Sequence, residues 1–397
     1  MILDEREKMF CPRMGDSYTR KMNVEEILED VAVKTLEKAM KKKNQSANLR
    51  NMRLAELPID MPQMIPNLQT LTEVDLSKNQ LFVVKTVFDI LSGLGNLKSL
   101  NISENFLNGP LPASVSKMAN LEELNLDVNR VTLLPDEVGS WTKLRTIAMA
   151  DNAICALPDA CKQWKELVSI DMHNNKIATV DEFLPVWTKL EKVNFSCNLL
   201  KTLPEGISNC EQLRLMDFTA NTITEIPESM AMLSKLETLR MGQNKVNAMP
   251  ADVLCMLTNL KDLQLYKNKI TEVPPEIGNL SSITKLSLAS NNIKSLPEEI
   301  GACTNLKELY LSNNAKFSSL PGSAGHLRML RDLICRKCPA LKQLPTTIEE
   351  LTSLRELDLR AAKKQVCKIT PETADIFKKA GCQVRGGVVK KGKKGKG

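Results

Sequence analysis

The sequence predicts an α/β solenoid, a horseshoe with a parallel β-sheet on its concave side, a helical cap at the N-terminus and a second cap at the C-terminus. Three observations predict this fold class. Asparagines recur at steps of 23 to 26 residues, each inside the phrase L-x-x-L-x-L-x-x-N-x-L. A Leu-Pro phrase follows in most repeats, and a helical pattern flanks the repeats on each side. A fixed period of this length is typical of repeat architectures, whose units bury their apolar side chains only by stacking.

The repeated phrase combines a short strand with a turn. One copy is LEELNLDVNRV, residues 121–131. Its L-x-L part alternates with period two, so the leucines point inward and their neighbours point outward. The asparagine amide is expected to bond backbone groups at the turn that leaves the strand, because a buried backbone group without a partner costs roughly 1–3 kcal/mol. The predicted structural ladder consists of Asn79, Asn105, Asn129, Asn152, Asn175, Asn198, Asn221, Asn244, Asn268, Asn291 and Asn314.

Further repeats replace the asparagine. Cys338 and Ala362 stand at the ladder position of the last two, and a degenerate repeat begins near Leu49. The solenoid is therefore predicted to span residues 48–366 with about thirteen repeats. The C-x-x-C pair of Cys335 and Cys338 is interpreted as a core substitution, because no second pair and no nearby histidine complete a zinc site.

The 23-residue period with L-P-x-x-I/V, as in residues 296–300, resembles the Ras-associated group of intracellular leucine-rich-repeat proteins. The resemblance covers roughly residues 48 to 370. It implies a non-enzymatic protein-binding scaffold or adaptor in signal transduction, with small GTPases and phosphatases as candidate partners by analogy. Proline suits the start of the short convex segment, because an N–H at that place lacks an intrahelical partner in any case.

Both ends of the stack are predicted to be capped. Residues 23–47 form the predicted N-terminal capping helix, whose apolar residues recur at helical spacing. A helix that docks a partner or a membrane is the alternative. Residues 367–385 form the predicted C-terminal cap, with a helix that starts at Pro371. Residues 1–22 are expected to be flexible, and the Gly- and Lys-rich residues 386–397 are expected to be a disordered basic tail.

The composition bears on nucleic-acid binding, on the cellular compartment and on membrane insertion. The net charge is +7, but the last eight residues contain five lysines and no acid, so the body is close to neutral and no specific nucleic-acid binding is predicted. The eleven cysteines are scattered, and no disulfide cluster caps the repeats, which favours a reducing, cytoplasmic compartment. The acidic N-terminus does not resemble a signal peptide, and no apolar run long enough for a transmembrane segment occurs.

No catalytic constellation is predicted. The two histidines, His173 and His326, lie far apart in the stack, and no hydrolase, metalloprotease or dinucleotide motif occurs. We therefore expect no enzyme, no cofactor and no metal. Three tryptophans, Trp141, Trp164 and Trp187, are 23 residues apart and are predicted to form a stacked layer in the convex-side core.

The outward strand positions carry the candidate partner-binding site. Acids dominate them up to Asn221, and bases become frequent from Leu236 onward. We predict that the chain is a monomer and that the second half of its concave face binds a protein with an acidic patch. The tyrosines and arginines of this half are of the residue types that are frequent in interface hot spots. An ordinary solvated strand face is the alternative at any single position. The predicted partner-binding residues are Arg240, Lys261, Tyr266, Lys267, Lys285, Tyr310, Arg331, Ile334, Arg336, Lys337 and Arg360.

A second function fits the same sequence. The chain is alternatively a structural component of a cytoskeletal or ciliary assembly, with the basic tail gripping acidic filaments. An adaptor is expected to be soluble, whereas a part of an assembly is expected to resist extraction by mild salt.

Overall fold

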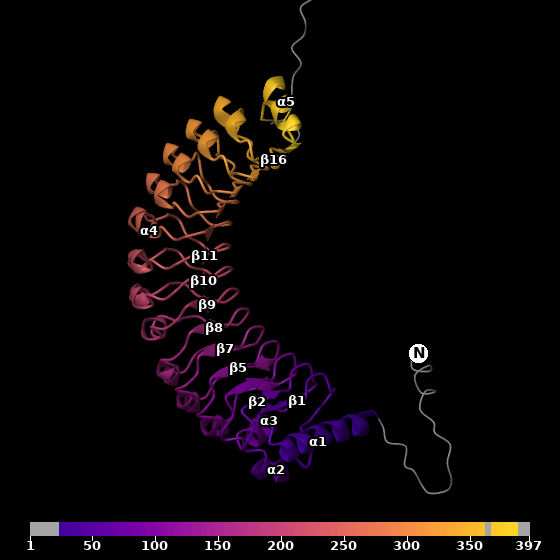
Figure 1. Ribbon diagram of the computed structural model, residues 1–397. Coiled ribbons are helices and arrows are strands. Elements are labelled where there is room, and N and C mark those ends of the chain that lie inside the picture. Colours follow the sequence, from indigo (N-terminus) through magenta and orange to yellow (C-terminus); the bar gives the residue numbers. More distant parts are fainter. Residues whose placement is uncertain (1–23, 362–366, 388–397) are drawn as a thin grey trace, which may run out of the picture.

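The computed structural model describes residues 24–361 and 367–387. These residues wind into an arc, with a fifteen-stranded parallel sheet along the inner side and short helices along the outer side (Figure 1). The predicted solenoid with a concave parallel sheet is confirmed. The expected flexible segment 1–22 and residues 388–397 of the expected tail lie outside the described residues.

Every strand of this sheet is three residues long, and its neighbours in space are its neighbours along the chain. A separate two-stranded sheet joins β4 (Asn108–Gly109) to β6 (Arg130–Val131) beside the main one. The strands of the main sheet are β1 (Ser46–Asn48), β2 (Glu73–Asp75), β3 (Ser99–Asn101), β5 (Glu123–Asn125), β7 (Thr146–Ala148), β8 (Ser169–Asp171), β9 (Lys192–Asn194), β10 (Leu215–Asp217), β11 (Thr238–Arg240), β12 (Asp262–Gln264), β13 (Lys285–Ser287), β14 (Glu308–Tyr310), β15 (Asp332–Ile334), β16 (Glu356–Asp358) and β17 (Gln383–Arg385).

The sheet has one strand more at each end than the thirteen repeats expected from the phrase. At the first end, β1 starts at Ser46, inside the range predicted for the cap, and its inward residue is Ala47 rather than leucine. At the other end, β17 pairs with β16 in the register Leu357↔Val384. An edge strand pairs by its backbone and covers one neighbour only, so it does not need the full leucine phrase.

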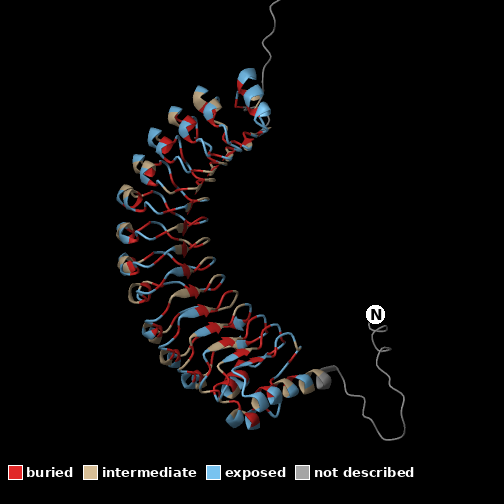
Figure 2. Ribbon diagram, viewed as in Figure 1, coloured by how far each residue is buried: buried red, intermediate tan, exposed pale blue. Residues whose placement is uncertain are grey.

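Alternation along each strand places one side chain in the core. The central residues Leu239 and Leu263 are 2% and 1% exposed, and residues on either side of them are intermediate. Figure 2 shows buried residues running the length of the arc between the sheet and the outer helices. Each repeat therefore buries its leucines against the repeats before and after it.

The asparagine of each repeat joins two neighbouring coils. The Asn221 side-chain oxygen accepts from the Leu200 N–H at 2.9 Å, and its amide donates to the carbonyls of Phe195 and Phe218 at 2.9 and 3.1 Å. The same arrangement recurs from Asn79 to Asn314. From Lys78 on, the residue before each of these asparagines is left-handed, with φ between 52° and 60°, which turns the chain out of the strand.

Cysteine takes the ladder position in the next repeat. The Cys338 thiol donates to the Leu311 carbonyl at 3.2 Å, and Cys335 lies buried among apolar side chains. Burial raises the pKa of both thiols above the ordinary value. Among the described residues, no group of three or more His, Cys, Asp or Glu side chains is arranged to hold a metal ion.

Short helices form the convex side. Pro135 precedes one of them as its cap residue, one position earlier than the sequence predicted, and its carbonyl accepts from the Val138 N–H at 3.2 Å. Helical turns need more width than hydrogen-bonded strands, so the stack bends toward the sheet. These segments are α2 (Met61–Met64), η1 (Ile65–Asn67), α3 (Val84–Leu91), η2 (Ala113–Lys117), η3 (Asp136–Ser140), η4 (Asp159–Gln163), η5 (Leu184–Val186), η6 (Glu205–Asn209), η7 (Glu228–Met232), α4 (Ala251–Met256), η8 (Pro275–Asn279), η9 (Glu298–Ala302), η10 (Gly322–His326) and η11 (Thr346–Glu350).

The three tryptophans stack in the convex half of the core. Their ring centroids are 6.1 Å apart at both steps, and Trp141, Trp164 and Trp187 are fully buried. The indole N–H of Trp164 donates to the Val138 carbonyl at 2.9 Å, and the other two make the equivalent bond. The layer therefore supports the core and offers no surface for a ligand.

A helix lies at each end of the stack. Helix α1 (Val24–Lys42) contacts β1 and buries Ala32, Leu36 and Ala39 (Figure 1). Helix α5 (Pro371–Lys379) starts where the Thr370 hydroxyl accepts from the Thr373 N–H at 3.1 Å. No helix among the described residues has the length and apolarity needed to cross a bilayer.

Candidate partner-binding surface

On the concave face of the sheet, the outward side chains do not pack into the core and are available to bind a partner. Each repeat directs outward the first and third residues of its strand and the two residues that precede the ladder position in the following turn, whereas the ladder residue itself is buried. The predicted partner-binding residues all lie on this face between β11 and β16. Arg240, Lys285, Tyr310 and Ile334 lie in strands, Lys261 and Arg331 directly precede strands, and Tyr266, Lys267, Arg336, Lys337 and Arg360 lie in the turns after them.

Many of the bases are paired with acids on the same face. Arg240 lies between Asp262 at 3.1 Å and Asp217 at 3.8 Å. The Lys261 ammonium is 2.7 Å from Glu237, and hydrogen bonds from Lys261 and Arg214 hold the pKa of Glu237 below its ordinary value.

Lys285 makes the same kind of contact with Glu308, at 3.1 Å. The second half of the face is therefore a pattern of alternating paired charges, and it is less positive than its bases alone indicate.

Two tyrosines lie flat on this face. The Tyr266 ring covers Gly242 of the preceding repeat so closely that a Cβ at position 242 would overlap it. The Tyr310 hydroxyl donates to Glu308 at 3.0 Å, and the Lys285 ammonium lies 5.5 Å from its ring centroid. Burial and Glu308 raise the pKa of Tyr310, so this phenol is a neutral donor. Both rings are only partly buried and remain available for contact.

Four of the predicted bases remain without an acidic partner. Within residues 24–361 and 367–387, no ion pair involves Lys267, Arg331, Arg336 or Lys337. Arg336 and Lys337 border a hollow of about 510 Å³ at the turns after β14, β15 and β16. Arg360, also among the predicted residues, lines the same hollow. The remaining lining residues were not predicted from the sequence, because a hollow depends on the shape of three turns and not on the repeat period.

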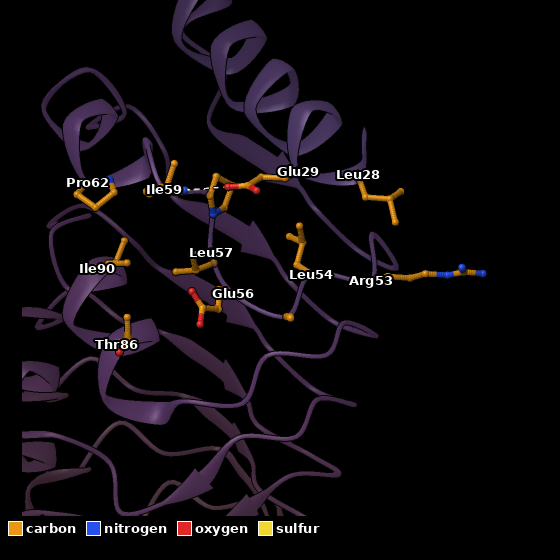
Figure 3. A pocket seen from close by; sticks show the side chains of 12 residues that line it. Leu28, Glu29, Arg53, Leu54, Glu56, Leu57, Ile59, Pro62, Thr86 and Ile90 are labelled. Atoms are coloured by element: carbon orange, nitrogen blue, oxygen red, sulfur yellow. Dashed lines mark hydrogen bonds between the residues drawn. The ribbon is translucent and has the colours of Figure 1, made fainter. Parts of the chain in front are cut away.

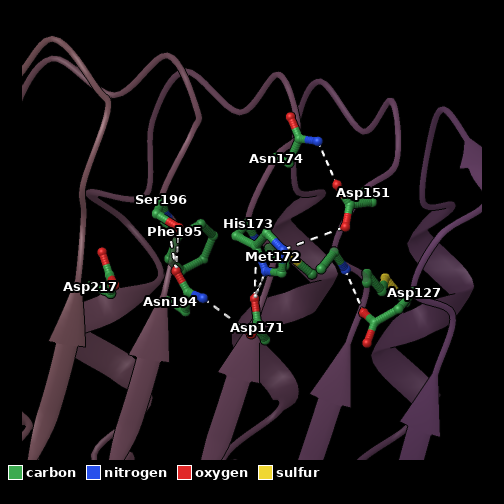
Figure 4. Close-up of polar contacts among 12 residues, drawn as sticks. Asp127, Asp151, Asp171, Met172, His173, Asn174, Asn194, Phe195, Ser196 and Asp217 are labelled. Atoms are coloured by element: carbon green, nitrogen blue, oxygen red, sulfur yellow. Dashed lines mark hydrogen bonds and ion pairs between the residues drawn. The ribbon is translucent and has the colours of Figure 1, made fainter. Parts of the chain in front are cut away.

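In the first half of the concave face, His173 lies among three aspartates (Figure 4). This cluster was not predicted from the sequence. His173 Nδ1 lies 2.8 Å from Asp171, and Nε2 lies 3.5 Å from Asp151. Asp127 accepts from the backbone N–H of Ala150 at 2.6 Å.

Burial would lower the pKa of His173, but the hydrogen bond that its ring donates to Asp171 and the charges of the three aspartates raise it above the ordinary value. Burial raises the pKa of Asp127. The sequence offered one signal for this cluster, namely three acids at neighbouring outward positions of consecutive repeats.

A second hollow lies between the N-terminal cap and the first repeats (Figure 3). It has a volume of about 510 Å³ and is lined mainly by apolar side chains from α1, residues 53–62 and α3. Glu29 crosses it and accepts from the Ile59 N–H at 3.2 Å, while Ile59 itself is 79% exposed. This hollow is the seam where the cap meets the stack, and it contains none of the predicted binding residues.

Comparisons with known proteins agree on the fold. Family models described as leucine-rich repeat and leucine-rich repeat region match residues 69–131 and 245–373. A leucine-rich-repeat protein of Leptospira interrogans superposes with a TM-score of 0.73 at 29% identity, covering 81% of this chain and 80% of its own. No curated protein matched the sequence.

Two solved structures of lower identity share the solenoid. InlJ of Listeria monocytogenes gives a TM-score of 0.65 at 20% identity, over 82% of this chain and 74% of its own. The Arabidopsis receptor kinase HAESA, in complex with the peptide hormone IDA and the co-receptor SERK1, gives 0.58 at 21% identity, over 79% and 61%. At this identity the likeness is one of fold.

Proposed function

We propose that this chain, a leucine-rich-repeat protein by its repeats and its fold, binds another protein through the second half of its concave face. The observation that carries the proposal is the combination of two partly exposed tyrosines, Tyr266 and Tyr310, with four bases that make no ion pair among the described residues. Aromatic rings supply contact area at a small cost in side-chain entropy, and arginine supplies directed hydrogen bonds. A partner with an acidic patch complements this surface.

The face is rigid before any partner arrives. Strands β11 to β16 each pair in parallel on both sides, and the turns after β11 to β15 are bonded by their ladder residues. A preorganised surface loses little entropy on binding, so more of the contact energy is available as affinity. The HAESA structure, whose complex includes a peptide hormone and a co-receptor, illustrates that a solenoid of this fold binds such molecules.

The cellular role that fits best is a non-enzymatic scaffold or adaptor in the cytoplasm. The ten described cysteines are all free thiols, which supports a reducing compartment. The L-P-x-x-I/V phrase supports the Ras-associated group, and with it small GTPases or phosphatases as partners of a monomeric chain. A cytoskeletal or ciliary component is the second candidate, favoured by the five lysines of the last eight residues. Extraction in rising salt distinguishes the two, because only a filament-bound chain requires salt for release.

The test replaces the two tyrosines of the face. Partners are first identified by proximity labelling in the source cells, and the full-length chain carrying Tyr266→Ala and Tyr310→Ala is then compared with the wild type in capture of those partners. We expect at least about a tenfold loss of affinity, since hot-spot aromatic residues contribute about 2 kcal/mol or more each.

The matched control is Met232→Ala with Met256→Ala, two large side chains on the convex side that are 64% and 52% exposed. We expect this variant to capture the partners as the wild type does. A folded tyrosine variant that keeps every partner, or a loss confined to the methionine variant, would contradict the proposal.

A further inference from the structure

The hollow after β14, β15 and β16 is lined by residues of three consecutive turns. Arg336, Lys337 and Arg360 supply its charged wall, and the rest of the lining consists of Asn313, Ala315, Pro339 and Ala361. A smaller hollow of about 280 Å³ adjoins it and also borders Arg336 and Lys337. These two side chains therefore stand between two depressions at the rim of the concave face.

Only one of the three bases in this wall is compensated. The Arg360 guanidinium donates to both oxygens of Asp358, from Nε at 2.9 and 3.1 Å and from Nη2 at 2.5 Å. Burial would raise the pKa of Asp358, but these bonds and the charge of Arg336 hold it below the ordinary value, so the carboxylate is ionised at neutral pH. Within residues 24–361 and 367–387, Arg336 and Lys337 have no ion pair. The hollow keeps two positive charges.

The two arginines occupy the same place in consecutive repeats. Since Ile334 pairs with Asp358 in register, Arg336 and Arg360 follow at equivalent positions on strands about 4.8 Å apart. Like charges placed side by side on a sheet are destabilising. Most other repeats avoid a charge here and use a small residue: Ser77, Ser103, Ala150, Ser196, Thr219, Gly242, Ala289 and Ser312.

The backbone that carries the two bases is held in place. The Arg336 N–H donates to the Ser312 hydroxyl at 3.2 Å, and the Lys337 N–H donates to the Arg360 carbonyl at 2.7 Å. Lys337 is left-handed, with φ of 57°, as required by the turn. The backbone that presents Arg336 and Lys337 to the hollow is therefore held by hydrogen bonds to the neighbouring repeats.

We propose that this hollow binds the phosphoryl group of a phosphorylated side chain on the protein that docks on the concave face. The proposal rests on the function proposed above. A phosphate monoester carries a charge of about −1.5 to −2 at neutral pH and presents three acceptor oxygens. These match the two uncompensated charges, and the guanidinium of Arg336 has the geometry to donate two parallel hydrogen bonds to them. A carboxylate carries one charge and leaves the other base uncompensated.

The test titrates the full-length chain with a glycine-flanked phosphoserine pentapeptide, and with the same peptide carrying serine or aspartate. The arginine Nε–H signals are followed by NMR. We expect saturable shifts of the Arg336 and Arg360 signals with the phosphopeptide, and binding at least about tenfold weaker with the aspartate peptide. Arg336→Gln is expected to weaken phosphopeptide binding about tenfold or more, whereas Arg328→Gln, on the convex side, is expected to leave it unchanged.

Three results of the peptide titrations would overturn the proposal: no shift with the phosphopeptide, equal binding of the aspartate peptide, or phosphopeptide binding that survives Arg336→Gln. Vesicles containing phosphatidate test a lipid source, and Arg336-dependent binding to vesicles without peptide binding would also overturn it. The function proposed above fails separately. If the phosphopeptide causes no shift but the tyrosine variant still loses its partners, only the proposed phosphate site is wrong. If the tyrosine variant captures its partners as the wild type does, the proposed binding face is wrong.

Discussion

At the scale of single residues, the ladder asparagines connect side-chain chemistry to the stability of the stack. Asn221 bonds one backbone N–H and two carbonyls from neighbouring coils, and it is 8% exposed. Asn221→Ala leaves these groups buried without partners. We expect a loss of about 2–4 kcal/mol in the free energy of unfolding, from roughly 1–3 kcal/mol for each buried unsatisfied group with partial relaxation. Urea unfolding followed by far-UV circular dichroism measures it.

Asn247, which lies in the next repeat after the ladder residue Asn244, provides the control. Its side chain is exposed, and Asn247→Ala is expected to change stability by no more than about 0.5 kcal/mol. Equal effects of the two substitutions would contradict the role assigned to the ladder.

His173 carries the clearest pH dependence of the concave face. Because Asp171 and its neighbours raise the pKa of His173, the charged imidazolium stabilises the folded state. That contribution is fully present below the unfolded pKa of about 6.5 and is lost as the pH rises through the higher folded pKa. His173→Gln removes this pH-dependent contribution to stability.

The measurement is an NMR titration of the two histidine rings, with His326→Gln assigning the signals. We expect a pKa above 6.5 for His173 and a lower one in Asp171→Asn, which removes the largest of the raising influences. A His173 pKa at or below 6.5 in the wild type would show that burial outweighs the aspartates.

At the scale of elements, the caps protect the ends of a stack whose repeats contact only their neighbours. Leu36 of α1 is fully buried at the first end. Leu36→Ala is expected to cost about 2–4 kcal/mol locally, the range for deleting a buried leucine side chain. Amide hydrogen exchange should then accelerate in β1 and β2 and stay unchanged in β11 and β12, because coupling along a solenoid is short-ranged.

Val31 of the same helix is the comparison, since its side chain is 42% exposed. Val31→Ala is expected to leave the exchange of β1 and β2 as in the wild type. Faster exchange spread evenly over all strands in Leu36→Ala would mean that the stack unfolds as one unit.

The sequence predicted the elements whose backbone geometry repeats from one copy of the phrase to the next. The period determined the strands and the sheet, because each copy of the phrase repeats the same backbone path. It also aligned Trp141, Trp164 and Trp187, which stack for that reason. The edge strand β1 was harder to predict, since it lacks the phrase and pairs mainly through its backbone.

The candidate site was less predictable than the fold. The outward positions followed from the alternation, but their charge balance depends on contacts between strands. The Lys285–Glu308 pair could have been derived from the strand register, in which the two residues are direct partners. The pairing of Arg240 with Asp262 is diagonal and depends on side-chain rotamers. The hollow at Arg336 depends on three turn shapes, none of which the period encodes.

At the scale of the whole molecule, the arc has two faces of different character. The convex side consists of short helices joined by the core beneath them, whereas the concave side exposes a continuous sheet (Figure 1). Acids gather around His173 in the first half, and bases without acidic partners gather near Arg336 in the second. If the proposed partner extends over both halves of the face, this difference in charge favours one orientation of the partner over the reverse.

Crosslink mapping of the chain bound to a partner identified in cells tests the central claim most directly. A lysine-reactive reagent is applied to the complex, and the linked lysines are identified by mass spectrometry. The account predicts links from Lys261, Lys267 and Lys337 on the concave face, and none from Lys117 of η2 or Lys162 of η4 on the convex side. Links concentrated on Lys117 and Lys162, with none between the concave lysines and the partner, would contradict the account.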